Sequence, residues 1–259
     1  MSPRIVIALA VASLALLGPA APGGAIANGN PDGQEHPNVG ALVAEWRSPG
    51  VKEVLCSGTL VAPRVFLTAG HCTSYLESLG MSRAWVTFDS AFDSSSVLVG
   101  GTLHTDPEYR RSQGDPHDLA VVVLDREVRG VTPAELPEAG AFDGADLRGR
   151  TFTAVGYGKH EATKDGAGRP TQAAPLVREQ ATASLTTSTA TWLKMSQNEA
   201  QGWGGTCKGD SGGPNFLGSS NLLAATTVTG DTYCKATNVA YRLDTPSARR
   251  FLGRFVALP

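Results

Sequence analysis

Short apolar runs, separated by clusters of turn-forming residues, are the feature that most restricts how this sequence can fold. Ten runs of at most eight residues cover 41–46, 54–61, 65–69, 84–88, 97–99, 119–124, 151–155, 191–195, 222–228 and 238–243. Glycine, proline, aspartate and serine gather between them, which is typical of many β-strands joined by turns. No regular alternation of strand and helix patterns is present, which argues against a parallel sheet. The sequence therefore predicts an all-β protein.

One helix is expected at the C-terminal end, over residues 246–257. Thr245 suits the N-cap, and Pro246 suits the first helical turn. The apolar side chains of this segment fall on one helical face, and they are Phe251, Leu252, Phe255 and Val256. Two other segments lack such periodicity, so we expect 132–149 to link two halves of the chain and 159–175 to form a long surface loop.

The composition is that of a globular protein large enough to bury a core. Of the 259 residues, 41% are apolar and 18% are charged, which excludes a disordered chain. The 22 basic and 24 acidic residues give a net charge of −2, so the chain lacks the positive surface that nucleic acids require. No apolar run reaches the length needed to cross a bilayer.

The first 25 residues have the pattern of a secretory signal peptide. Arg4 precedes a mostly apolar run over residues 5–17, and small residues follow. The glycines and prolines after that run argue against a buried helix. We therefore expect a secreted protein, with cleavage after Ala25 and with Ala20 and Ala27 as alternative sites.

Export makes disulfides possible, and the chain has four cysteines: Cys56, Cys72, Cys207 and Cys234. Four cysteines allow three pairings, among which the spacing does not decide. No Cys-x-x-Cys spacing is present, so a structural zinc site is not expected. Two cysteines lie in each half of the chain, and local pairing would close one loop in each half.

The strongest chemical signal is the run 209–214, which reads Gly-Asp-Ser-Gly-Gly-Pro. A serine between glycines can occupy a tight turn with its hydroxyl exposed and with backbone N–H groups nearby that stabilise an oxyanion. The Gly-x-Ser-x-Gly pattern also occurs in α/β-hydrolases, whose catalytic histidine follows the serine in the chain. Here the last of five histidines is His160, so a histidine base must precede Ser211.

Two histidines have contexts that suit a catalytic base. His71 follows an apolar strand pattern, and His117 stands next to Asp118, at the start of another apolar run. A carboxylate at the start of a strand can be held firmly and can point at an imidazole. The remaining histidines have polar loop contexts and are expected at the surface: His36, His104 and His160.

Three segments carry a resemblance to a known family. Residues 67–72 read Leu-Thr-Ala-Gly-His-Cys, residues 117–120 read His-Asp-Leu-Ala, and residues 207–214 read Cys-Lys-Gly-Asp-Ser-Gly-Gly-Pro. In this order they resemble the signature segments of the chymotrypsin-like (trypsin/chymotrypsin, S1) serine proteases. Further matches are Ile-Ala-Asn-Gly at 26–29, Cys-Ser-Gly-Thr-Leu at 56–60 and Gly-Tyr-Gly at 156–158.

The resemblance implies two six-stranded antiparallel β-barrels with the active site between them, followed by the C-terminal helix. The protease domain would span residues 26–259, with the first barrel at about 26–131 and the second at about 150–244. Four cysteines are fewer than vertebrate members contain, so the chain looks like a minimal bacterial form.

The resemblance also assigns catalytic roles. Ser211 would be the nucleophile, His71 the general base and then the general acid, and Asp118 the residue that orients the imidazole. The backbone N–H groups of Gly209 and Ser211 would form the oxyanion hole. This site implies a secreted endopeptidase that forms an acyl-enzyme.

Further implied features are cross-links and an activation pair. Cys56 would pair with Cys72, and Cys207 would pair with Cys234. The ammonium group of a chain that begins at Ile26 would pair with Asp210, beside the nucleophile.

The specificity pocket is expected to involve Gly205, Thr206, Gly230 and Asn238. Gly205 stands where trypsin-like members carry an aspartate at the pocket floor, so the floor has no fixed charge. The glycines would leave room for an apolar or aromatic side chain before the cleaved bond. An Arg/Lys preference remains the alternative, because Asp231 could point inward and supply the counter-ion.

No metal or cofactor is expected, since Asp89 and Asp93 suit a solvated loop better than a calcium site. Protein or peptide substrates are the expected partners, protein inhibitors a further class, and the chain is expected to be a monomer that binds neither nucleic acid nor, without its signal peptide, membranes. A catalytically silent homologue that binds a partner is the alternative function. The order Asp32, His71, Ser211 also occurs in subtilisins, but Asp32 lies in a Pro-Asp-Gly turn.

Overall fold

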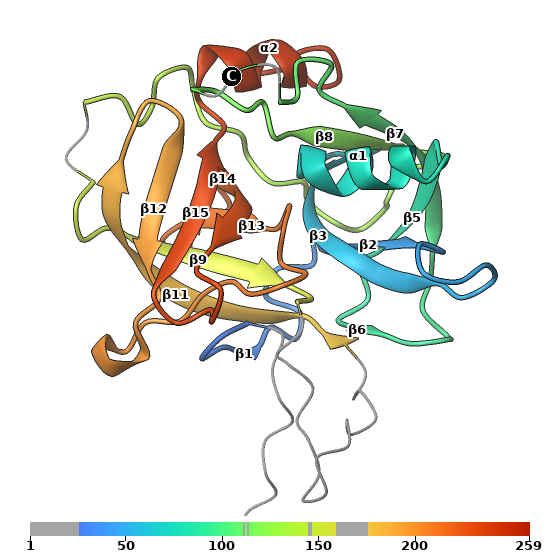
Figure 1. Ribbon diagram of the computed structural model, residues 1–259, viewed down its shortest axis with the longest axis horizontal. Coiled ribbons are helices and arrows are strands. Elements are labelled where there is room, and N and C mark those ends of the chain that lie inside the picture. The colour runs from blue at the N-terminus through green and yellow to red at the C-terminus, as the bar shows by residue number, and fades with distance from the viewer. Residues whose placement is uncertain (1–25, 111, 113, 145–146, 159–175) are drawn as a thin grey trace, which may run out of the picture.

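The computed structural model describes residues 26–259, except for 111, 113, 145–146 and 159–175. The expected signal peptide, the expected loop at 159–175 and His160 therefore lie outside the described residues. Figure 1 shows two β-barrels side by side, with the first half of the chain in one and the second half in the other.

Six antiparallel strands close the first barrel in the order β2-β3-β4-β8-β7-β5. They are β2 (Val39–Ala44), β3 (Glu53–Ala62), β4 (Val65–Thr68), β5 (Arg83–Thr87), β7 (Val99–Thr105) and β8 (Ala120–Leu124). Their apolar residues alternate in direction. In β2, for example, Leu42 and Ala44 pack inside the barrel, while Val39, Ala41 and Val43 pack in a second cluster shared with the other barrel.

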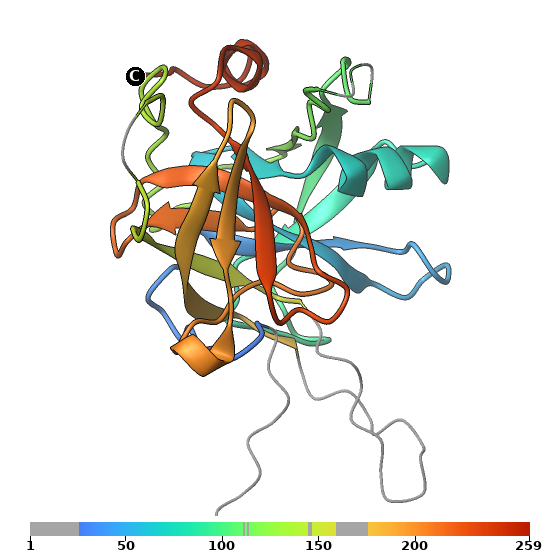
Figure 2. The same ribbon diagram turned by 60° about the vertical axis from the view of Figure 1, so that its left-hand side comes forward.

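The second barrel has the order β11-β12-β15-β14-β13-β9, and pairing of β11 with β9 closes it. Its strands are β9 (Thr151–Gly156), β11 (Glu179–Ser188), β12 (Trp192–Ser196), β13 (Pro214–Leu217), β14 (Leu223–Gly230) and β15 (Thr237–Arg242). The short strand β1 (Asn30–Pro31) adds to β11. These strands come forward in Figure 2, and the prediction of two six-stranded antiparallel barrels is confirmed.

Two connections join the barrels. In the first connection, the strands β6 (Ala91–Phe92) and β10 (Leu176–Val177) pair with each other between the two barrels. The segment 132–149 lies between β8 and β9, where Ala134 and Phe142 are buried. One apolar cluster contains residues of both barrels, including Leu67 and Leu119 from the first and Val155 and Phe216 from the second. The two halves are therefore packed together through a common core.

The helices differ from the expectation in two ways. The helix α2 (Pro246–Leu252) begins as predicted, with the Thr245 hydroxyl accepting the Ala248 N–H at 3.2 Å, but it ends before 257. A further helix, α1 (Gly70–Ser78), was not expected, because its sequence has few apolar residues and its N-cap, Ala69, offers no side-chain cap. A short 3₁₀ helix, η1, covers Glu199–Gln201. No helix in the described part of the chain is long and apolar enough to cross a membrane.

Candidate active site

His71 and Asp118 meet at the end of two paired strands of the first barrel. Thr68 in β4 pairs with Ala120 in β8, so the residues after one strand lie beside the residues before the other. The imidazole Nδ1 of His71 lies 3.0 Å from Oδ2 of Asp118 and 3.2 Å from Oδ1. The backbone N–H of His71 donates to the same Oδ1 at 2.8 Å. These contacts fix both the imidazole and the carboxylate, and leave Nε2 of the ring for another partner.

A glycine allows this close approach. A Cβ atom at Gly70 would lie 3.0 Å from the Leu119 carbonyl oxygen and 3.2 Å from Oδ1 of Asp118. Asp118 is 5% exposed, whereas the side chain of His71 is 30% exposed. The carboxylate is therefore shielded from solvent, while the imidazole can be reached by a substrate.

Ser211 lies in a tight loop that leads into β13. Gly209 and Gly212 on either side have φ values of 96° and 81°, in the region that favours glycine. Ser57 of β3 holds this loop in place. Its N–H donates to the Ser211 carbonyl at 2.9 Å, and its hydroxyl donates to the Gly209 carbonyl at 3.1 Å. The sequence pointed to Ser211 but not to the anchoring role of Ser57.

The serine loop is packed against the strand that leads to His71. A Cβ atom at Gly212 would lie 2.1 Å from Oγ1 of Thr68 and 2.8 Å from the backbone N of Ala69. Thr68 stands three residues before His71 in the chain. The structure thus brings the three predicted catalytic residues to one place at the junction of the barrels.

Two backbone donors of the serine loop, one of them on Ser211 itself, have no acceptor in the described part of the protein. Within the residues that the structure describes, neither the Gly209 N–H nor the Ser211 N–H donates to a protein oxygen, although their carbonyl groups are both used. Donors of this kind are available to a developing negative charge.

Both implied disulfides are formed. Cys56 is bonded to Cys72, which directly follows His71, and Cys207 is bonded to Cys234 near Ser211. The group Cys56, His71 and Cys72 is compact enough to hold a metal ion, but its two sulfur atoms are joined to each other and are not available as ligands.

The expected activation pair belongs to a chain that begins at Ile26, so the structure of the whole chain does not test it. Ile26 is buried, but its backbone N–H donates to Oε2 of Glu179 at 3.0 Å rather than to Asp210. The Asp210 carboxylate accepts the N–H groups of Cys207 and Gly158, each at 2.8 Å. Burial raises the pKa of Asp210 to about 8, and the nearby Glu179 carboxylate adds to the rise. Glu179 was not singled out from the sequence, because nothing near it resembles a motif.

The predicted pocket residues lie together, but the glycine at its floor is not beside empty space. Backbone hydrogen bonds pair Gly205 with Ala27, and Gly230 pairs with Asn238 between β14 and β15. A Cβ atom at Gly205 would lie only 2.4 Å from Oε1 of Gln197. A side chain at position 205 would therefore collide with this carboxamide, while the size of the substrate side chain that the site accepts stays a prediction.

The Asp231 carboxylate stabilises the turn that begins at this residue. Its carboxylate accepts the backbone N–H groups of Lys235, Ala236 and Thr237 at 2.8–3.1 Å. Although burial alone would raise it, the pKa of Asp231 is lowered overall by these backbone donors. Thr206 is buried, as is Asn238, whose Nδ2 donates to Oδ1 of Asn215 at 2.7 Å.

Other predicted residues have structural partners. Asp93 accepts the N–H and hydroxyl of Ser95, and Asp89 accepts the Val97 N–H, so both carboxylates are used within their own loop.

The surroundings of three histidines differ from those expected from the sequence. His117 is buried, and its Nδ1 contacts Oδ2 of Asp106 at 3.2 Å. His36 is not a free surface residue, because it is hydrogen-bonded to Asp32 and stacked on Phe216. His104 belongs to β7 rather than to a loop.

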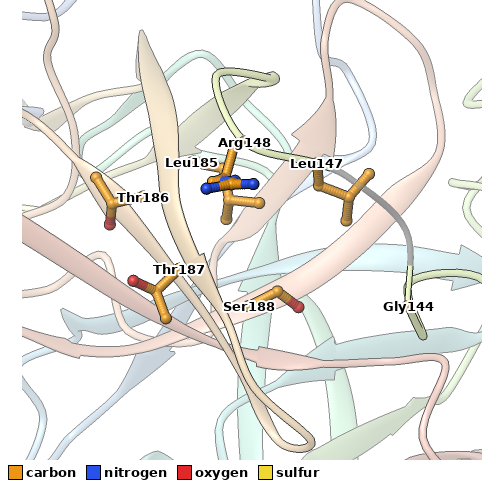
Figure 3. Close-up of a pocket in the computed structure, with 7 residues that line it drawn as sticks. All are labelled: Gly144, Leu147, Arg148, Leu185, Thr186, Thr187 and Ser188. Atoms are coloured by element: carbon orange, nitrogen blue, oxygen red, sulfur yellow. The ribbon is translucent and has the colours of Figure 1, made fainter.

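A cavity of about 460 Å³ lies away from these residues. Figure 3 shows the residues that line it, on β11 and the segment before β9: Gly144, Leu147, Arg148, Leu185, Thr186, Thr187 and Ser188. None of the predicted catalytic or pocket residues contributes to it.

Comparisons with known proteins agree with this geometry. The family model described as Trypsin matches residues 32–250. A curated protein named chymotrypsin, from Phaedon cochleariae, is 27% identical over 202 residues, which are 73% of this chain and 68% of that protein. A solved structure titled HL collagenase has a TM-score of 0.67 and 15% identity, over 88% of this chain and 97% of its own. At that identity the structural likeness concerns the fold.

Proposed function

Because the chain belongs to the trypsin family, we propose that Ser211, His71 and Asp118 are its catalytic triad and that it acts through an acyl-enzyme on Ser211. The protein is a serine-type endopeptidase, and its substrates are proteins or peptides. The observation that carries the proposed triad is the contact of the His71 Nδ1 with Asp118, beside the strand end against which the serine loop is packed.

The three side chains have different tasks in the proposed reaction. Nε2 of His71 takes the proton of the Ser211 hydroxyl as its oxygen attacks the carbonyl carbon of the peptide bond. Asp118 accepts a hydrogen bond from the Nδ1–H group of His71, which fixes that tautomer and stabilises the imidazolium that forms. The imidazolium then protonates the leaving amine as the peptide C–N bond breaks, which leaves an acyl-enzyme ester on Ser211. His71 next takes a proton from a water molecule that attacks this ester, and returns a proton to the Ser211 oxygen.

The negative charge of the tetrahedral intermediate is placed beside the N–H groups of Gly209 and Ser211. Each such donor typically contributes about 10²- to 10³-fold to the rate. The φ value of Gly209 supports this role, because an L-residue side chain would strain the backbone that orients the donor.

We propose that the residue before the cleaved bond is apolar or aromatic. The pocket around Gly205 and Thr206 presents no carboxylate at its floor, and Asp231 is engaged by backbone N–H groups. A lysine or arginine would therefore be buried without a counter-ion. An Arg/Lys preference that is lost in Asp231→Asn would contradict this.

We also propose that the protein is secreted and that removal of residues 1–25 completes the site. A free amino group at Ile26 would lie beside the Glu179 carboxylate, with the buried Asp210 as the second carboxylate. A carboxylate partner raises the pKa of an ammonium group, so the stabilising effect of this pair would be present at lower pH and lost as the pH rises through the folded pKa. A fully active chain whose N-terminal sequence begins elsewhere would rule this out.

Covalent labelling tests the triad. A phosphonate or sulfonyl fluoride probe should label Ser211 in the folded protein and should fail to label Ser211→Ala. The exposed Ser219 provides a matched control, since Ser219→Ala should be labelled as the unchanged protein is. Peptide mapping of the adduct identifies the residue. Folded protein that is never labelled would instead indicate a catalytically silent homologue that binds a partner.

A further inference from the structure

We propose that Gln197 forms the floor of the specificity pocket and restricts the residue before the cleaved bond to short apolar side chains. This inference rests on the proposed protease site and narrows its substrate class. No sequence motif includes Gln197, which stands eight residues before Gly205.

Gln197 directly follows β12 and is held by its backbone, whose N–H donates to the Ala236 carbonyl at 3.1 Å. The residue is 1% exposed, which is exceptional for glutamine. Its carboxamide points toward Gly205. A Cβ atom built there would lie 2.4 Å from Oε1 and 3.3 Å from Cδ of Gln197.

The family resemblance implies that a side chain at position 205 would stand at the floor of the pocket. The Gln197 carboxamide occupies the place of that side chain. The glycine at 205 is thus required by Gln197, since even an alanine would collide with it. The sequence suggested an open floor, but the Gln197 carboxamide fills it.

The carboxamide is also anchored at its other end. Nε2 of Gln197 lies 3.5 Å from Oδ1 of Asp231, the carboxylate that organises the turn from 231 to 237. The disulfide of Cys207 and Cys234 ties the same turn to the serine loop. Gln197 therefore lies between Gly205 on one side and the turn of Asp231 on the other.

The chemistry of this floor is neutral. Oε1 of Gln197 is buried and has no donor among the described residues, and the same holds for Oδ1 of Asn238. Asn238 is fully buried at the back of the pocket, with its Nδ2 committed to Asn215. Two carboxamides thus take up depth without providing a charge, so a short apolar side chain fits best above them.

The experiment compares kcat/KM on matched peptide amides that differ only in the residue before the cut: Ala, Val, Leu, Phe, Tyr or Lys. We expect the unchanged protein to prefer Ala or Val to Phe by about ten-fold or more, since one methylene in such a pocket changes rates by roughly 10- to 200-fold. Gln197→Ala should raise the Phe-to-Ala ratio at least about ten-fold.

Two variants provide controls. Gln197→Met keeps the length of the side chain but removes its polarity, so it should preserve the preference for short side chains. Gln201→Ala makes the same chemical change at an exposed position of η1 and should leave all ratios unchanged. Rates are divided by the fraction of protein that a phosphonate labels, so partial misfolding does not affect the comparison.

The outcomes separate this inference from the proposed triad. An active protein that prefers Phe over Ala, or a Gln197→Ala variant with unchanged ratios, would overturn the role of Gln197 alone. A strong preference for Tyr over both Phe and Ala would also overturn it, because substrate would then reach the Oε1 atom. Failure of the probe to label Ser211 would count against the triad itself.

Discussion

The two halves of the active site are built on different physical principles. The His71 and Asp118 half stands on β4 and β8, where every residue of β4 and four of the five in β8 are buried. These strands are apolar apart from Thr68. The Ser211 half is surrounded by buried polar groups, which are Gln197, Asp210, Asn215, Thr226, Thr227 and Asn238.

The difference assigns separate tasks to the barrels. Apolar strands hold His71 and Asp118 in the first barrel, whereas hydrogen-bonded polar groups hold the loop of Ser211 in the second. Burial of polar groups around Ser211 reduces the stability of the protein where such a group lacks a hydrogen-bond partner. Of the five buried polar atoms left without a partner in the described residues, three are in the second barrel: on Gln197, Thr226 and Asn238.

The largest effect should come from breaking the contact between the two halves. Ser211→Ala or His71→Ala should each lower kcat by about 10⁴- to 10⁶-fold, and the double variant should lose little more, because the residues act as a unit. Steady-state kinetics on one peptide substrate measure this, with thermal unfolding to show that the fold is kept. Losses that multiply in the double variant would mean that the two residues act independently.

The buried carboxylate of the polar half should give the uncleaved chain an unusual pH dependence. The pKa of Asp210 is about 8 when folded and near 3.8 when unfolded, so the folded state binds the extra proton between these values. The stability that this proton contributes is fully present below pH 3.8 and is lost as the pH rises to 8, with a total change on the order of several kcal/mol.

Thermal unfolding of the full chain between pH 4 and 8 tests this, in a Ser211→Ala background that prevents self-digestion. Asp210→Asn should flatten the fall in stability with rising pH. The control is Asp93→Asn, which replaces a carboxylate that is not buried. This substitution should leave the slope of stability against pH unchanged. An equal slope with and without Asp210 would contradict the raised pKa.

A third prediction concerns the link between the halves. Arg178 of the second barrel is fully buried, and its guanidinium donates to Oδ2 of Asp32 at 2.7 Å. It also donates to the carbonyl groups of Val39 and Phe88, in the first half of the chain, each at 3.0 Å. Arg178→Met should destabilise the protein by about 3–5 kcal/mol, because the buried Asp32 carboxylate then loses its guanidinium partner and keeps only its hydrogen bonds with His36.

Chemical denaturation measures this loss, and two variants sharpen it. Replacing both partners, in Arg178→Met with Asp32→Leu, should recover much of the stability. Arg83→Met breaks the exposed pair with Asp125 and should cost less than about 1 kcal/mol. If the double variant were as unstable as Arg178→Met, the carbonyl contacts rather than the ion pair would carry the effect.

The sequence predicted the parts of the molecule that depend on short segments. The neighbourhoods of His71, Asp118 and Ser211 could each be read from a few consecutive residues, and so could the start of α2 from Thr245 and Pro246. The nearly continuous apolar and buried residues of β2 and β3 also explain why these two strands were anticipated.

What the sequence did not predict depends on residues far apart in the chain. Asp32 read as a turn residue, yet it pairs with Arg178 at a separation of 146 residues. Gln197 and Glu179 gain their roles only from neighbours brought by folding. The strand β11 was missed because its outward residues are threonine, serine and glutamine, so its inward alanines and one leucine form a weak pattern.

The last and smallest prediction compares the two cross-links, one in each half. The disulfide between Cys56 and Cys72 closes a loop of 16 residues, and that between Cys207 and Cys234 closes one of 27. From loop closure alone, replacing either pair by alanine should destabilise the protein by about 3 kcal/mol, slightly more for the longer loop. The effects on activity should differ, because only the second disulfide ties the turn of Asp231 to the serine loop. We expect loss of the Cys207–Cys234 pair to relax the preference for the residue before the cut, while loss of the first pair leaves that preference unchanged. Denaturation and matched peptide kinetics measure the two effects, and equal relaxation in both variants would show that the halves do not divide their tasks in this way.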